Sequence, residues 1–134
     1  MKPLSLCFAL AAVLAGCGLS VQSADLFLLT RSGAGRRLTL LVSDDGTVRC
    51  DGGAAKPLSD KLLIQARDLA KTLNDDAKRR MHIRSTPQSV ATYTVRLQHG
   101  TISFPDTAAR AHPELAQLEL FAVQVARVPC GLHG

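Results

Sequence analysis

The feature that most restricts the fold of this chain is a strand–turn–strand pattern between residues 25 and 50. Residues 36–43 (RRLTLLVS) and 47–50 (TVRC) are rich in β-branched and apolar side chains, and the turn sequence Asp44-Asp45-Gly46 separates them. An Asp-Gly turn between two such segments is a strong signal for a β-hairpin. Residues 25–31 (DLFLLTR) predict a further strand, followed by a turn at Ser32–Gly35. Because hairpins join antiparallel neighbours, this region predicts an antiparallel sheet.

Two later segments have the spacing of helices. Ser59 is a suitable N-cap, and apolar residues then recur at helical spacing up to Leu73, after which the pair Asp75-Asp76 indicates an end. Pro113 suits the first turn of a second helix, whose apolar residues continue to Val128. Both segments therefore predict amphipathic helices that cover a sheet.

Between the helices lie two more strand-like segments. Residues 90–97 (VATYTVRL) alternate in polarity, and His99-Gly100 provides a turn into residues 101–104 (TISF). The order of elements is then β-β-β-α-β-β-α. We predict an α+β fold: an antiparallel sheet of four to five strands with two helices packed on one face.

The first residues of the chain have the composition of a secretory signal. A positively charged start, Met1-Lys2-Pro3, precedes the small and apolar run Leu4–Gly16. This run is shorter than the roughly 20 apolar residues that a membrane-spanning helix needs. Its last residues, Leu14-Ala15-Gly16-Cys17, resemble the lipobox of bacterial lipoproteins. An ordinary signal peptide with an incidental cysteine is the alternative.

The lipobox resemblance implies that Cys17 receives a diacylglycerol and becomes the mature N-terminus. Two or three acyl chains hold a protein on a membrane durably, whereas one chain does not. The predicted organisation is a removed signal peptide at 1–16, a lipidated cysteine and short tether at 17–24, and a single domain at 25–134. The predicted location is the cell envelope, anchored to a membrane by lipid and facing outside the cytoplasm.

The four cysteines fit an exported protein. Cys7 leaves with the signal and Cys17 carries the lipid, so Cys50 and Cys130 remain as an even pair in an oxidising compartment. We predict a disulfide between them. A metal-binding or redox-active pair is the alternative, but neither cysteine lies in a CxxC motif.

Motifs for metal, cofactor or catalytic chemistry are not found in the sequence. The four histidines, His82, His99, His112 and His133, form neither an HxxxH nor an HExxH pair, and no GxSxG motif occurs. The formal net charge of +5 is too small to argue for nucleic acid, and the few aromatic residues offer little for stacking bases. We therefore predict a protein that is not an enzyme and has no cofactor, no metal and no nucleic-acid partner.

Two short segments are candidates for binding. The segment SGAGRR at 32–37 contains GxG, but it lacks the third glycine and the helix of a dinucleotide-binding motif, so a hairpin turn at Ser32, Gly33, Ala34 and Gly35 is the better interpretation. The densest basic run is a candidate contact for an anionic surface such as a membrane, and a solvated helix end that Asp75 and Asp76 partly neutralise is the alternative. This run consists of Lys78, Arg79, Arg80 and Arg84.

Several segments taken together resemble the emfourin family, small bacterial inhibitors of thermolysin-like metallopeptidases. The matching segments are Ser32–Gly35 after an early strand, Tyr93-Thr94-Val95 in a later strand, Phe104-Pro105-Asp106, and residues 113–118 (PELAQL). The resemblance covers most of residues 25–128 and implies a sheet with two helices and a protease-facing loop at Ser32–Gly35. The chain departs from the family in its lipobox, its cysteine pair and the single glycine between Ser32 and Ala34.

Together these features predict a lipid-anchored, exported, non-enzymatic protein-binding module. The best specific hypothesis is a peptidase inhibitor, whose partner is an extracellular peptidase. The alternative is a structural or assembly lipoprotein that binds another component of the cell envelope.

Overall fold

The computed structural model describes residues 24–132. The predicted signal peptide at 1–16, the lipidation site Cys17 and all of the tether except Ala24 lie outside the described residues. The domain predicted to begin at residue 25 begins with a strand at that residue.

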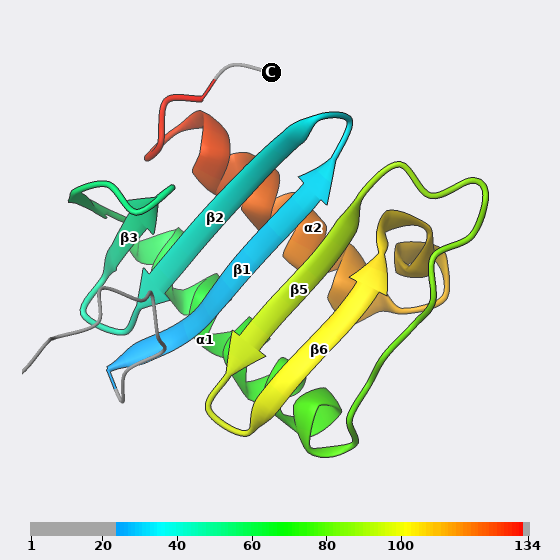
Figure 1. The fold of residues 1–134 in the computed structure, drawn as a ribbon. Coiled ribbons are helices and arrows are strands. Elements are labelled where there is room, and N and C mark those ends of the chain that lie inside the picture. The colour runs from blue at the N-terminus through cyan, green and yellow to red at the C-terminus, as the bar shows by residue number, and fades with distance from the viewer. Residues whose placement is uncertain (1–23, 133–134) are drawn as a thin grey trace, which may run out of the picture.

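Six strands form one antiparallel sheet with the order β4-β3-β2-β1-β5-β6 (Figure 1). They are β1 (Asp25–Gly33), β2 (Arg36–Ser43), β3 (Thr47–Cys50), β4 (Ala55–Pro57), β5 (Thr92–Leu97) and β6 (Gly100–Pro105). The central strand, β1, pairs with β2 on one side and with β5 on the other. This interior position suits the consecutive apolar residues Phe27, Leu28 and Leu29, which are all buried.

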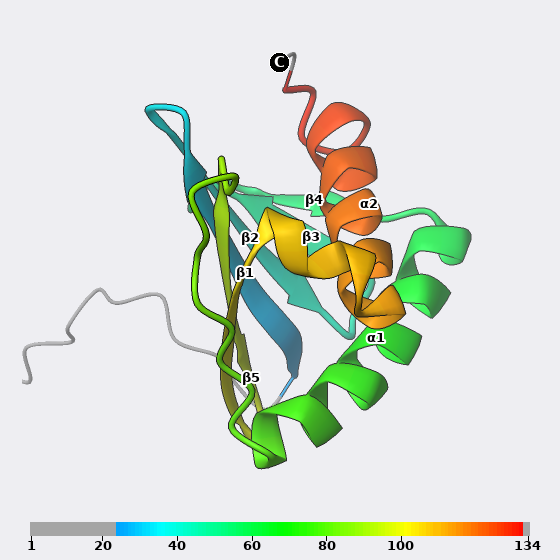
Figure 2. The same cartoon turned by 90° about the vertical axis from the view of Figure 1, so that its right-hand side faces the viewer.

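Helices α1 (Asp60–Lys78) and α2 (Pro113–Arg127) cover one face of this sheet, and a short 3-10 helix, η1 (Asp106–Arg110), precedes α2 (Figure 2). The Ser59 hydroxyl accepts a hydrogen bond from the backbone N–H of Leu62, as expected of an N-cap. The α+β class, the antiparallel sheet and the two helices on one face are thus confirmed.

Five details differ from the prediction. The strand predicted at residues 90–97 begins at Thr92, and the Val90 N–H donates to the Asp106 carboxylate. The sheet has a sixth strand, β4, because three residues ending at Pro57 pair with β3 although they are too short to show alternation. The turn predicted at Ser32–Gly35 is narrower, since β1 continues through Gly33. Helix α1 continues past Asp75-Asp76 to Lys78, because Ala77 packs into the core. Helix η1 was not predicted.

The core lies between the helices and the sheet. Phe27 on β1 packs edge-on against Phe121 on α2, with ring centroids 5.8 Å apart. Tyr93 on β5 stacks on Phe104 of β6 at 5.2 Å. These aromatic contacts join β1 to α2, and β5 to the edge strand β6.

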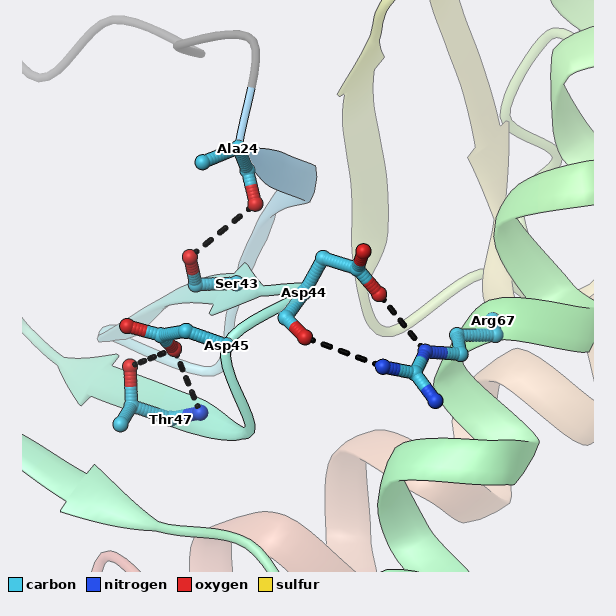
Figure 3. Close-up of polar contacts among 6 residues, drawn as sticks. All are labelled: Ala24, Ser43, Asp44, Asp45, Thr47 and Arg67. Atoms are coloured by element: carbon cyan, nitrogen blue, oxygen red, sulfur yellow. Dashed lines mark hydrogen bonds and ion pairs between the residues drawn. The ribbon is translucent and has the colours of Figure 1, made fainter.

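Polar contacts hold the β2–β3 turn against the first described residue and against α1 (Figure 3). The Asp45 carboxylate accepts hydrogen bonds from both the N–H and the hydroxyl of Thr47, at 3.0 and 2.6 Å. Arg67 on α1 donates to the Asp44 carboxylate at 2.6 Å, and the Ser43 hydroxyl donates to the Ala24 carbonyl. Ala24 therefore lies at the end of the sheet that carries this turn, and we call it the Ala24 end.

The predicted disulfide is present. Cys50 at the end of β3 is bonded to Cys130, which lies just after α2, and their Cα atoms are 5.8 Å apart. The bond joins the sheet to the end of the second helix across a sequence separation of 80 residues.

Candidate functional site

The tip of the β1–β2 hairpin protrudes from the end of the sheet opposite the Ala24 end (Figure 1). The tip consists of Ala34 and Gly35, whose φ angles of 53° and 71° are both positive, as in the tight turns that fit the twist of paired strands. Next to it, Gly33 packs against the chain at Val90: a Cβ atom on Gly33 would lie 2.2 Å from the Val90 carbonyl oxygen. The tip is therefore held by backbone packing at its base while its end stays in open space.

A concavity of about 490 Å³ lies between this hairpin and the last turns of α2. We call it the arginine groove, because four arginines line it. The lining residues are Arg31, Arg36, Arg37, Leu38, Asp51, Tyr93, Ala122, Val123, Ala126, Arg127 and Leu132.

The register of the sheet and two small side chains create the groove. Arg31 on β1 pairs with Leu38 on β2 and with Tyr93 on β5, so these three residues form one row across the sheet. Arg31 follows the buried Phe27 and Leu29 in the two-residue period of the strand, which places it on the helix-facing side. Opposite this row, α2 presents Ala122 and Ala126, whose short side chains leave space above the row.

The disulfide positions the far end of the groove. Asp51 follows Cys50, and Leu132 comes two residues after Cys130. Asp51 is also held by Thr39: its carboxylate accepts from the Thr39 N–H, and its own N–H donates to the Thr39 carbonyl, both at 2.8 Å. The backbone N–H of Leu132 donates to the carbonyl of Ala126 at 2.8 Å.

The positive charges of the groove lack ion-pair partners among the described residues. Arg31 contacts an uncharged partner: its Nε–H donates a hydrogen bond to the Tyr93 hydroxyl at 3.3 Å. Its guanidinium carbon lies 6.0 Å from the centre of the Tyr93 ring. Arg36, Arg37 and Arg127 are exposed and form no ion pair with a described residue. The groove therefore presents an excess of positive charge.

A partly buried carboxyl group on α2, that of Glu119, interacts electrostatically with both Arg31 and Tyr93. Burial, with a smaller contribution from the nearby Asp106 carboxylate, raises the pKa of Glu119 to about 7, while Arg31 acts to lower it. One oxygen of Glu119, Oε1, is fully buried and has no hydrogen-bond partner among the described residues. Burial likewise raises the pKa of the Tyr93 hydroxyl, so Tyr93 stays a neutral acceptor for Arg31.

Glu119→Gln is expected to stabilise the protein increasingly as the pH rises from about 4.5 to about 7. In this range the unfolded chain has an ionised Glu119 while the folded chain keeps it protonated, so the native state binds more protons and wild-type stability falls with rising pH. Glutamine cannot ionise and avoids this loss. The gain stays below what the full pKa change implies, because water still reaches the side chain.

The measurement is urea unfolding of both proteins at about pH 4.5, 6 and 8. Glu114→Gln, on the same helix, is the control for removing a carboxylate. If the free energies of unfolding of wild type and Glu119→Gln differed by the same amount at all three pH values, the prediction would be wrong.

The predicted basic run is divided. The Lys78 ammonium nitrogen lies 3.8 Å from a carboxylate oxygen of Asp75, and a guanidinium nitrogen of Arg79 lies 2.9 Å from a carboxylate oxygen of the buried Asp76. The acidic pair therefore offsets these two positive charges. Arg80 is exposed just after the helix, with a φ of 57°.

Helix α1 ends beside the β5–β6 turn at the Ala24 end, because the Asn74 side chain accepts from the backbone N–H of His99. Arg84 is separated from this helix end: His82 pairs with Ser103 midway along β6, so the chain carries Arg84 along the edge of the sheet.

The predicted loop at Ser32–Gly35 thus borders the groove, but the groove itself was not predicted. The sequence shows each of its parts, namely RR after the turn and an Ala-x-x-x-Ala spacing in the second helix. No local pattern indicates that these two segments meet. Within residues 24–132, no group of three or more His, Cys, Asp or Glu side chains is placed to hold a metal ion.

No protein-family model, curated protein or solved structure matches this chain. What the structure itself defines is an α+β domain with a protruding β1–β2 hairpin and the arginine groove beside it. None of the helices in the described region is both long enough and apolar enough to cross a membrane.

Proposed function

We propose that this chain is a lipid-anchored, non-enzymatic protein-binding module of the cell envelope, and that its specific role is to inhibit an extracellular peptidase. The observation that carries the proposal is the β1–β2 tip, which protrudes from the sheet opposite the Ala24 end (Figure 2). The arginine groove lies beside this hairpin. A turn that is already ordered before binding loses little conformational entropy on entering a partner's cleft.

The position of Ala24 supports the orientation that the proposal needs. Strand β1 has nine residues, which span about 30 Å between the Ala24 end and the tip. A lipid on Cys17, seven residues before Ala24, would hold the Ala24 end near the membrane and direct the tip away from it. In this orientation a partner outside the cytoplasm reaches the tip without obstruction by the bilayer.

The basic helix end fits the same orientation. Lys78, Arg79 and Arg80 lie at the Ala24 end, where an anionic lipid surface attracts each unpaired basic residue by about 1 kcal/mol. Since two of them already pair with aspartates, their contribution is small beside that of the acyl chains. Arg84 lies apart from this helix end, along the β6 edge of the sheet.

Exposed apolar surface next to the tip also supports protein binding. The Val90 side chain, whose backbone packs against Gly33, is 67% exposed. On the other side of the tip, the groove adds Val123 and Leu132, which are 44% and 40% exposed. Large exposed apolar side chains beside a rigid turn are typical of a surface that a partner covers.

The proposal predicts that full-length, detergent-solubilised protein inhibits a thermolysin-like metallopeptidase at close to a one-to-one ratio. Ala34→Asp is expected to weaken inhibition at least tenfold, because it places a charged side chain at the tip. Aspartate tolerates the left-handed backbone at this position, so the thermal unfolding temperature should change little. The assay is residual peptidase activity against inhibitor concentration.

The matched control is His99→Asp, which places the same charge on the β5–β6 turn at the Ala24 end and should leave inhibition unchanged. Equal loss in both variants would show that the tip is not the inhibitory element. If no secreted peptidase is inhibited but an envelope protein forms a stable complex, the chain is instead a structural or assembly lipoprotein. If neither occurs, the protein-binding proposal is wrong.

A further inference from the structure

We infer that the arginine groove binds an acidic peptide segment of the partner, with carboxylates paired to the groove arginines and an apolar side chain on the groove floor. This inference rests on the proposed protein-binding function and specifies the chemistry of the partner. It assigns recognition to a surface separate from the two-residue tip.

The balance of charge in the groove favours carboxylates. Arg31, Arg36, Arg37 and Arg127 all line one concavity, and Asp51 is the only acidic residue among its lining residues. Asp51 already accepts a hydrogen bond from the Thr39 N–H. Guanidinium groups bind carboxylates through two parallel hydrogen bonds, and such charge-assisted pairs are stronger than neutral ones.

The acidic groups behind the groove do not neutralise these arginines. Glu119 faces Arg31, but its raised pKa of about 7 leaves it largely protonated in mildly acidic solution and partly protonated at neutral pH. Asp106 influences the same cluster, and its carboxylate accepts a hydrogen bond from the Val90 N–H at 3.1 Å. Neither carboxylate comes within 4.0 Å of a guanidinium nitrogen of Arg31.

The floor of the groove favours a peptide over a simple anion. Leu38, Ala122 and Ala126 form an apolar surface between the arginines, and Val123 and Leu132 border it. Phosphate or sulfate would pair with the guanidinium groups but would leave this surface in contact with water. A segment that alternates acidic and large apolar side chains covers both, and 490 Å³ is within the usual size of a ligand-binding cleft.

The test is fluorescence anisotropy of a fluorescein-labelled peptide, Gly-Leu-Glu-Leu-Asp-Phe-Glu-Gly, with full-length protein in a nonionic detergent. The control peptide carries glutamine and asparagine in place of glutamate and aspartate. The acidic peptide is expected to bind at least tenfold more tightly than the control, and its affinity should fall as salt is added.

Two variants examine the two parts of the inference. Arg36→Gln combined with Arg127→Gln removes charge from opposite sides of the groove and should weaken binding of the acidic peptide at least tenfold. Ala126→Leu retains every arginine but fills the floor, and should weaken binding by a similar factor. Arg96→Gln is the control for removing one positive charge elsewhere, and it is compared with Arg36→Gln alone as well as with the double variant. Arg96 is exposed on β5 outside the groove and alternates with the buried Val95 and Leu97.

Equal binding of the two peptides would overturn the inference, as would unchanged binding in both groove variants. If Arg96→Gln weakened binding as much as the double variant does, the net charge of the protein would explain the binding. That result would also overturn the inference. None of these three results contradicts peptidase inhibition through the tip, which the Ala34→Asp assay tests separately. Conversely, groove-dependent peptide binding without any protein partner would contradict the proposed function alone.

Discussion

Replacing either Cys50 or Cys130 with alanine is expected to lower the free energy of unfolding by about 2 to 5 kcal/mol, and by nearly the same amount in each case. The bond joins residues 80 positions apart, so the unfolded chain gains much conformational freedom when it is removed. In the chain-entropy account, a loop of this length corresponds to roughly 4 to 5 kcal/mol. Both variants lose the same bond, which is why their effects should agree.

The measurement is urea unfolding of each single variant and of the double variant. If the two cysteines act only as partners, the double variant should be no less stable than the singles, because the second substitution removes nothing further. A severe effect from one cysteine with a silent effect from the other would contradict a shared bond. The single variants should also bind the acidic peptide more weakly, since the bond positions Asp51 and Leu132.

Gly33→Ala is expected to lower the free energy of unfolding by about 2 to 3 kcal/mol, an unusually large effect for one added methyl group. The new Cβ would lie 2.2 Å from the Val90 carbonyl oxygen and 2.8 Å from the Ala91 Cα. These are backbone atoms of the segment that leads into β5, so no side-chain rotation relieves the clash. The segment must move away from the hairpin or the hairpin must bend.

Gly35→Ala is the matched control, two residues away in the same hairpin. Its Cβ would have no atom within 4 Å, so only the positive φ of 71° opposes the substitution, at about 1 to 2 kcal/mol. Thermal and urea unfolding compare the two variants. If Gly33→Ala cost no more than Gly35→Ala, the packing of Val90 against the hairpin would not constrain the tip.

The elements that were predicted correctly depend on residues close in the sequence. The Asp44-Asp45-Gly46 turn, the Ser59 cap and the Pro113 helix start each act within a few residues, so their signals survive without knowledge of the fold. The differences arose where distant contacts decided the outcome. β4 exists because it pairs with β3, and α1 continues to Lys78 because Ala77 reaches the core.

For the candidate site, local sequence signals were enough to predict the disulfide partners and the approximate place of the β1–β2 turn. Once Cys7 and Cys17 are assigned to the predicted signal and lipid, Cys50 and Cys130 remain as the pair, and Gly33 and Gly35 mark a turn between two strand-like segments. The tertiary structure alone decided that a groove lies beside this turn. The insertion of β5 next to β1 sets Tyr93 against Arg31, and the packing of α2 brings in Arg127, 96 residues further along the chain. Such a site depends on pairing and packing between distant segments, which no local pattern of residues encodes.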